Sequence, residues 1–141
     1  MSSKAFQTDL KRGQVAEKLL FEIFKSWDWK PELAEGYFPD WDIRVKSGKT
    51  VEVKWDVMAQ KTGNICLELE ALNHSKADVL AVAYGRPIKA FYLLEMDKAR
   101  KFAKGWGNKK KVGEFKVESA LIKRTLFLEL LKPKIIDLQT K

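Results

Sequence analysis

Two stretches near the middle of the chain alternate strictly between polar and apolar side chains. Residues 42–46 and 51–55 both have this period of two, which is typical of β-strands with one buried face. The Ser-Gly-Lys sequence at 47–49 has the composition of a tight connection. A three-residue loop there keeps the two apolar sets on one face and places Asp42 opposite Lys54. The pattern therefore predicts a β-hairpin with one apolar and one polar side.

The remaining hydrophobic pattern predicts a helix before the hairpin and further strands and helices after it. Apolar residues recur at helical spacing over 8–27, and residues 79–83 are apolar throughout, as in a strand buried on both faces. For the C-terminal segment 119–132, which is predicted as a helix, a strand is the alternative because the leucines at 126, 128 and 130 also alternate. The other expected elements are a first strand over 32–38, a loop over 56–64, a third sheet strand at 65–69, a strand over 88–94, a helix over 97–104, a mobile loop over 105–113 and a C-terminal helix over 119–132.

This order of elements predicts an α/β fold in which helices flank one mixed central β-sheet. The 141 residues suit a single domain over 1–141, with residues 1–7 as a loose end. The hydrophobic content of 45% argues against disorder.

The polar side of the predicted hairpin gathers three ionisable side chains that stability does not require. Glu52 and Lys54 lie two residues apart on one strand, so both face Asp42. Two carboxylates repel each other, and hard oxygen ligands of this kind suit Mg²⁺ or Mn²⁺. Such an ion activates water and stabilises a leaving oxygen, while a neighbouring lysine can orient that water or neutralise charge on phosphorus. We therefore expect a phosphodiester substrate; the alternative is ordinary surface charge on an edge hairpin.

The sequence from Pro39 to Asp42, Pro-Asp-Trp-Asp, followed by Glu52-Val53-Lys54 resembles the motif of the PD-(D/E)XK nuclease superfamily. The resemblance implies a restriction-endonuclease-like α/β/α core. It also implies metal ligation by Asp42, by Glu52 and by the carbonyl of Val53, with Lys54 beside the attacking water. A second resemblance, to small phage and archaeal-type Holliday junction resolvases, comes from residues 62–70 and 75–78. Together the two resemblances cover roughly residues 10–95.

Two further acidic residues leave alternatives open. Glu17 lies at the border of the apolar stripe of the first helix, where it is either a boundary residue in a salt bridge or aimed at the site. The resemblance implies the second role, as a further catalytic residue and metal ligand, because the family often adds a glutamate from this helix. Asp40 shares the face of Asp42 and matches the literal PD of the family name. The predicted hairpin favours Asp42, since Asp40 lies one residue pair further out.

The formal net charge of +8 and the pI of about 9.5 suit a polyanionic partner. We expect DNA, with branched DNA favoured, and a homodimer, since symmetric cuts in two strands suit two symmetric subunits. Trp106 could stack on a base beside the lysines of the predicted 105–113 loop, and the alternative is a half-buried tryptophan beside a solvated lysine run. The candidate phosphate contacts are Lys61, Lys109, Lys110, Lys111, Lys123 and Arg124.

The few cysteines and histidines exclude other kinds of site. Cys66 is the one cysteine and His74 the one histidine, which excludes a disulfide framework, a multi-thiolate zinc site and a two-histidine metal motif. No apolar run reaches the ~20 residues of a membrane span, and the first residues lack the apolar stretch of a signal peptide. We therefore expect no membrane partner and a cytoplasmic location, or an intracellular one in an infected host.

These observations favour a metal-dependent deoxyribonuclease, and within that class a structure-selective endonuclease such as a Holliday junction resolvase. An exonuclease is an alternative within the class. A catalytically inactive DNA-binding module and a protein-interaction domain are alternatives outside it.

Overall fold

The structure is a computed structural model that describes residues 4–35, 40–112 and 117–138. A six-stranded mixed sheet has the strand order β1-β2-β3-β5-β6-β9. Strands β3 and β5 are parallel and the other neighbouring pairs are antiparallel. The strands are β1 Glu32–Leu33, β2 Ile43–Arg44, β3 Thr50–Asp56, β5 Val79–Tyr84, β6 Ala90–Glu95 and β9 Lys134–Asp137.

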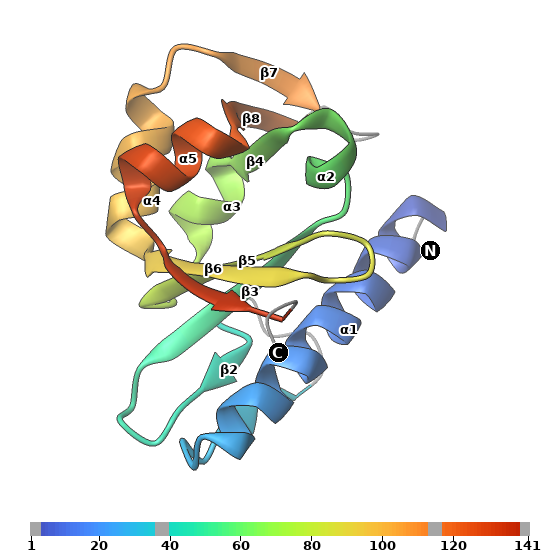
Figure 1. The fold of residues 1–141 in the computed structure, drawn as a ribbon, viewed down its shortest axis with the longest axis vertical. Coiled ribbons are helices and arrows are strands. Elements are labelled where there is room, and N and C mark those ends of the chain that lie inside the picture. The colour runs from blue at the N-terminus through green and yellow to red at the C-terminus, as the bar shows by residue number, and fades with distance from the viewer. Residues whose placement is uncertain (1–3, 36–39, 113–116, 139–141) are drawn as a thin grey trace.

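In the described residues, five helices and a second sheet accompany the six-stranded sheet (Figure 1). The second sheet has the order β4-β8-β7 and consists of β4 Asn64–Glu68, β8 Val117–Lys123 and β7 Lys109–Val112. The helices are α1 Lys4–Ser26, α2 Ala59–Thr62, α3 Leu69–His74, α4 Met96–Gly105 and α5 Arg124–Leu131. This architecture confirms the predicted α/β class with a mixed central sheet flanked by helices.

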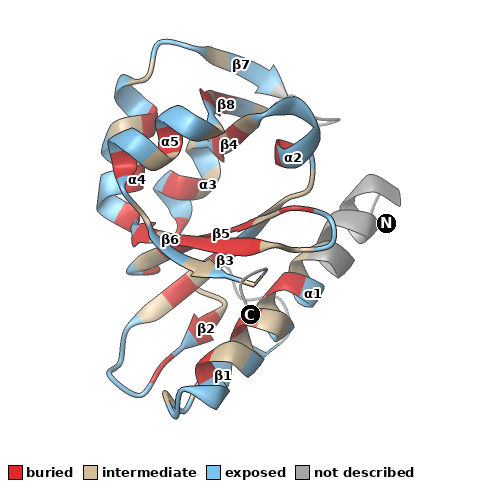
Figure 2. Ribbon diagram, in the orientation of Figure 1, coloured by how far each residue is buried: buried red, intermediate tan, exposed pale blue. Residues whose placement is uncertain are grey.

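Two hydrophobic cores lie on opposite faces of the six-stranded sheet, and β5 contributes to both (Figure 2). Ala81 and Ala83 pack with α1, whereas Leu80 and Val82 pack with the second sheet and helices α3, α4 and α5. This alternation confirms the prediction of a strand that is buried on both faces. The sheet is therefore held between α1 on one side and a larger layer on the other.

The hairpin of β2 and β3 forms with a different register from the predicted one. Its apolar side is as expected, since Ile43, Val45, Val51 and Val53 are all buried in the core beneath α1. However, Ile43 pairs with Val51, and the loop occupies residues 46–48 rather than 47–49. The predicted pairing of Asp42 with Lys54 is therefore wrong, because the turn begins one residue earlier. Both polar sets still share one face, since the shift along the partner strand is two residues.

Several other predictions fail where strands pair over long sequence separations. The segment at 65–69 forms β4 in the second sheet, where Ile65 pairs with Ile122, and β9 was not predicted. This pairing makes residues 117–123 a strand, so the last helix begins at Arg124 rather than at residue 119. Pairing with β8 also turns much of the predicted 105–113 loop into β7. Helix α2 lies within the predicted 56–64 loop.

The N-terminal segment also differs from the prediction. Helix α1 begins at Lys4, so residues 4–7 are helical rather than loose, and residues 1–3 lie outside the described ranges. Residues 36–38 of the predicted first strand lie outside them as well. None of the helices in the described ranges combines the length and the hydropathy that a membrane span requires.

Candidate active site

Strand β3 carries the two central side chains of the candidate site. Because Val51 and Val53 point into the core beneath α1, Glu52 and Lys54 point to the opposite face of the sheet. Lys54 is about half exposed and the Glu52 side chain is 16% exposed. Their charged ends, Nζ and Oε2, are 4.0 Å apart. The spacing of two residues therefore places an acid and an amine side by side, as the sequence predicts.

Asp42 joins this pair through the backbone of β3. Its Oδ2 accepts a hydrogen bond of 2.7 Å from the backbone N–H of Val53, and its own N–H donates to the carbonyl of Val51 at 2.9 Å. These two bonds fix Asp42, which directly precedes β2, against the residues that flank Glu52. Asp42 therefore reaches the site, although through a register that the sequence did not predict.

Glu17 reaches the same group from α1. Burial, a hydrogen bond between the Glu17 and Asp42 side chains, and the negative charges of Asp42 and Glu52 raise the pKa of Glu17 to about 8. Lys54 acts in the opposite direction. The geometry thus supports the reading in which this boundary glutamate is aimed at the hairpin, and at neutral pH its carboxyl is largely protonated.

The electrostatics of Glu52 show that the site has an excess of negative charge. Burial, followed by the charge of Asp42, raises the pKa of Glu52 to about 7, while Lys54 and a hydrogen bond from Ser75 lower it. The single ammonium group of Lys54 therefore does not keep all three neighbouring carboxyl groups ionised at neutral pH. An additional cation would stabilise the ionised form of all three.

The donor set suits an open site for a hard cation rather than a closed one. Within the described ranges, no three His, Cys, Asp or Glu side chains form a group that could hold a metal by themselves. Mg²⁺ commonly uses one or two protein carboxylates and completes its shell with waters and substrate phosphates. Asp42 and Glu52 fit that pattern, with the Val53 carbonyl as the further ligand that the family motif implies.

Asp42 interacts with the other acidic side chains of the candidate site, whereas the contact given by Asp40 comes from its backbone. Asp42 accepts the hydrogen bond of the Glu17 carboxyl and carries the charge that raises the pKa of Glu52. The backbone carbonyl of Asp40 accepts a hydrogen bond from the N–H of Lys76 at 3.1 Å, which ties its chain segment to the α3–β5 connection. Pro39 of the motif lies outside the described residues.

Four of the six predicted phosphate contacts are exposed, and two are used inside the protein. Lys61, Lys110, Lys111 and Lys123 are exposed. Lys109 donates to the carbonyls of Lys104 and Trp106 and so closes the end of α4. The Arg124 guanidinium lies 4.4 Å from the centre of the Tyr84 ring and donates to the Tyr92 hydroxyl at 2.8 Å. Arg124, a predicted phosphate contact, is therefore half-buried and its guanidinium is engaged by two tyrosines.

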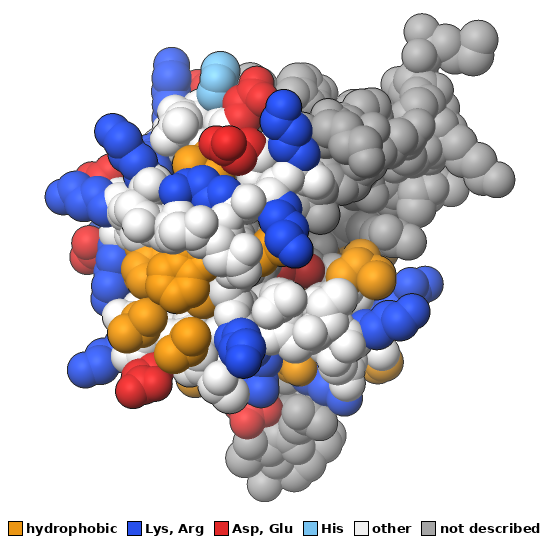
Figure 3. Space-filling model, turned by 90° about the horizontal axis from the view of Figure 1, so that it is seen from above, with side chains coloured by type: hydrophobic (Ala, Val, Ile, Leu, Met, Phe, Trp, Pro, Cys, Tyr) orange, Lys and Arg blue, Asp and Glu red, His pale blue; other side chains and the backbone are white. Residues whose placement is uncertain are grey.

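Trp106 also has a structural role. Its indole N–H donates to the Leu121 carbonyl at 2.8 Å, and its ring stacks on Phe102 with centroids 5.0 Å apart. Trp106 is thus half-buried, as in the alternative prediction, because its N–H and the ring face against Phe102 have partners within the protein. Figure 3 shows the exposed Lys and Arg side chains spread around this end of the molecule, with a hydrophobic group among them.

Two polar residues near the site were missed by sequence reasoning. Ser75 is buried and its hydroxyl donates to Glu52 Oε1 at 3.2 Å. Asp56, at the end of β3, accepts backbone hydrogen bonds from Cys66 at 2.7 Å and from Met58 and Ala59 at the start of α2. The sequence carries no local signal for the contacts of Asp56, since the segment after it reads as a loop and the cap position of α2 is Met58. Ser75 lies in the 75–78 segment of the second resemblance, which does not indicate a contact with Glu52.

A cavity of about 330 Å³ lies directly beside Lys54. Its apolar lining includes Leu67, Leu72 and Leu80. Its charged lining residues are Lys54, Asp56 and Glu68. The candidate site therefore has room for a substrate group next to the amine.

Comparison with known proteins does not identify the chain. It matches no model of a protein family, and no curated protein matches its sequence.

Proposed function

We propose that this protein is a Mg²⁺- or Mn²⁺-dependent nuclease that hydrolyses DNA phosphodiesters. The observation that carries the proposal is the meeting of Glu17, Asp42, Glu52 and Lys54, in which one amine does not keep three carboxyl groups ionised. Ionisable groups whose pKa values are raised by burial and by a neighbouring like charge cluster at functional sites. The resemblance to the PD-(D/E)XK superfamily is consistent with this chemistry.

Each residue of the site has a role in the proposed reaction. Asp42 and Glu52, with the Val53 carbonyl, would hold the cation, which when bound lowers the pKa of water and offsets charge on the phosphate. Lys54 would orient the attacking water and neutralise charge that builds on the phosphorus. Glu17 would hold Asp42 in place by their hydrogen bond and, once ionised, would add a third negative charge.

DNA binding would depend mainly on exposed lysines. Lys61, Lys110, Lys111 and Lys123 would contact phosphates in a largely sequence-independent and salt-dependent way. The cavity beside Lys54 would receive the nucleoside next to the scissile bond. Phosphate contacts carry no sequence information, so selection by DNA shape, with a branched substrate and a homodimer, is our preferred form of the proposal.

The decisive experiment incubates the protein with labelled branched, single-stranded and duplex DNA. We expect cleavage with Mg²⁺ or Mn²⁺ and none with EDTA, and we expect Glu52→Gln to bind DNA without cutting it. A second candidate, a DNA-binding module without catalysis, is favoured by the net charge of +8. A mobility shift at low salt without cleavage under either metal would replace the nuclease proposal with that module.

A further inference from the structure

The Ser75 hydroxyl is arranged so that its single proton goes to Glu52. Ser75 directly follows α3 and is 5% exposed. Its oxygen accepts the N–H of Ala77 at 3.2 Å, and the same hydroxyl lies 3.2 Å from Glu52 Oε1. A hydroxyl has one proton and two lone pairs. Because a backbone N–H can only donate, a lone pair of the Ser75 oxygen accepts the N–H of Ala77. The proton of the Ser75 hydroxyl is then donated to the Glu52 carboxylate.

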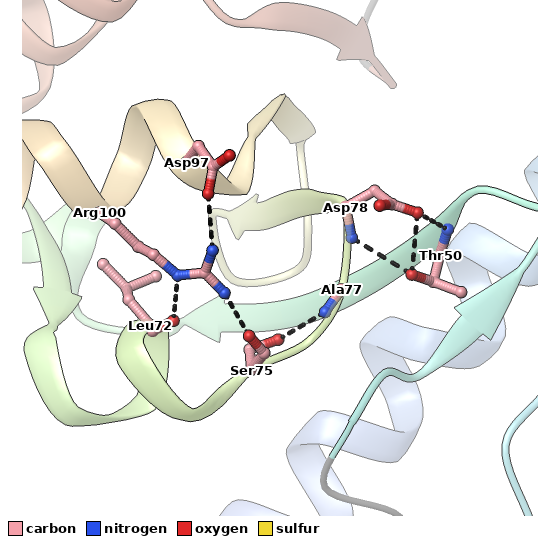
Figure 4. A network of polar contacts seen from close by, with 7 residues as sticks. All are labelled: Thr50, Leu72, Ser75, Ala77, Asp78, Asp97 and Arg100. Atoms are coloured by element: carbon pink, nitrogen blue, oxygen red, sulfur yellow. Dashed lines mark hydrogen bonds and ion pairs between the residues drawn. The ribbon is translucent and has the colours of Figure 1, made fainter.

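Arg100 on α4 fixes the backbone that carries this hydroxyl (Figure 4). Its Nε donates to the Leu72 carbonyl at 2.7 Å, and its Nη2 donates to the Ser75 carbonyl. Its third contact is an ion pair of 2.8 Å with Asp97 on its own helix. One planar guanidinium thus binds two carbonyls near the end of α3 and is itself held in position.

These contacts select one oxygen of Glu52. Oε1 is engaged by Ser75, whereas Oε2 is the oxygen that lies 4.0 Å from Lys54. A carboxylate held at one oxygen presents the other in a defined direction. Carboxylates that bind metals are commonly held by such hydrogen bonds.

We propose that Arg100 and Ser75 form a strut that positions Glu52, with its free oxygen directed toward Lys54 and the cation. This inference rests on the proposed function, because it assigns the strut to the same metal site. Arg100 acts through Ser75 and does not touch the reacting atoms, so both are positioning residues. The strut explains why a buried serine and a half-buried arginine connect α4 to β3.

Thr50 provides a matched control within the same network. Its N–H and hydroxyl bind Asp78 Oδ2 at 2.9 and 3.2 Å, and its hydroxyl also accepts from the Asp78 N–H at 3.2 Å (Figure 4). These bonds join the starts of β3 and β5 two residues from Glu52, and the hydrogen bonds of Thr50 go to Asp78 rather than to Glu52. Thr50→Val therefore removes hydrogen bonds of similar kind nearby while leaving the strut intact.

The test measures Mn²⁺ affinity without DNA, by titration of the folded protein. We expect Ser75→Ala and Arg100→Gln to weaken Mn²⁺ binding by about 10–100-fold, and Thr50→Val to leave it within about twofold. Ser75→Thr, which keeps the hydroxyl, should restore most of the affinity. Urea unfolding of each variant identifies any that fail to fold. Arg100→Lys keeps the charge but loses the planar fork, so its Mn²⁺ affinity should fall between those of wild type and Arg100→Gln.

Two outcomes separate the strut from the proposed function. Mn²⁺ affinity that is equal in wild type and Glu52→Gln would overturn the metal site and the strut together. Affinity that is lost in Glu52→Gln but retained in both Ser75→Ala and Arg100→Gln would overturn the strut alone.

Discussion

Strand β3 carries a half-buried carboxylate near each end, Glu52 and Asp56, and the two have different surroundings. The contacts of Asp56 indicate a structural role, and those of Glu52 indicate a functional one. Asp56 accepts three backbone N–H groups, from Met58, Ala59 and Cys66. Glu52 has one hydroxyl donor and a lysine 4.0 Å away, and it faces the like charge of Asp42. Burial raises the pKa of both groups. What distinguishes Glu52 is therefore not its burial but the shortage of donors and the surplus of negative charge around it.

The largest expected effect is that of Glu52→Gln on catalysis. Glu52→Gln keeps the shape of the side chain but removes its charge, so we expect cleavage of DNA to fall by at least ~10²-fold. The same variant should retain or raise stability in the absence of metal at pH 8, because it removes a repelled buried charge. Cleavage rates and urea midpoints measured on one preparation would check both parts. Unchanged cleavage would place Glu52 outside the active site.

At the other end of β3 we expect the opposite pattern. Asp56→Asn weakens the bonds that join β3 to α2 and β4, and hydrogen bonds to a charged group contribute roughly 1.5–3 kcal/mol each. We therefore expect a loss of roughly 2–3 kcal/mol in the free energy of unfolding, with the catalytic rate of the folded fraction nearly unchanged. Urea denaturation and activity at low temperature would measure the two quantities. A stable Asp56→Asn protein without activity would contradict the structural role of Asp56.

The contrast also predicts how pH and metal act on stability. The pKa values of Glu17 and Glu52, about 8 and 7, lie above the ordinary value of 4.5, so the folded state binds more protons than the unfolded chain. Their contribution to stability is full below pH 4.5 and is lost as pH rises through 7 and 8. A bound cation offsets that loss because it favours the ionised carboxylates.

Mg²⁺ should therefore stabilise the protein at pH 8 and have little effect at pH 5. At roughly 100 times its Kd a ligand adds about 2.7 kcal/mol, which corresponds to a rise in Tm of about 5–10 °C for a domain of this size. Thermal unfolding at both pH values, with Ca²⁺-free Mg²⁺ or EDTA, would measure it. An equal rise at pH 5 and pH 8 would show that the ion binds elsewhere, and Glu52→Gln should abolish the rise at pH 8.

The sequence predicts the parts of this site that depend on local spacing. Glu52 and Lys54 share a face because they are two residues apart on a strand, and residues 79–83 form a buried strand because they are apolar throughout. The exact register of Asp42 was not predictable in this way, since it depends on which residue begins the turn. A shift of two positions preserves the faces and leaves the hydrophobic pattern unchanged, so the pattern cannot detect it.

Contacts between distant segments account for what the sequence did not predict. Ser75 reaches Glu52 across 23 residues, and Ile122 pairs with Ile65 across a longer interval. Lys109 and Arg124 belong to a basic sequence, yet both donate to groups inside the protein, because a long cationic side chain can cross an apolar surface to reach an acceptor. Charge along the chain thus predicts the sign of a partner better than it predicts which lysine or arginine is available to it.

The smallest expected effect concerns the neighbouring aspartate. Asp42 binds the Val53 N–H and the Glu17 carboxyl, whereas Asp40 contributes its backbone carbonyl to Lys76, which substitution of the side chain leaves in place. We therefore expect Asp40→Asn to change the rate of DNA cleavage by less than about twofold and stability by less than about 0.5 kcal/mol, the usual range for surface substitutions. Asp42→Asn, measured beside it, should lose at least ~10²-fold in rate. If Asp40→Asn proved the more damaging of the two, the cation would have to lie beside Asp40 rather than Asp42. The hydrogen bond from Val53 to Asp42 would then have a structural role, like the hydrogen bonds that Asp56 accepts.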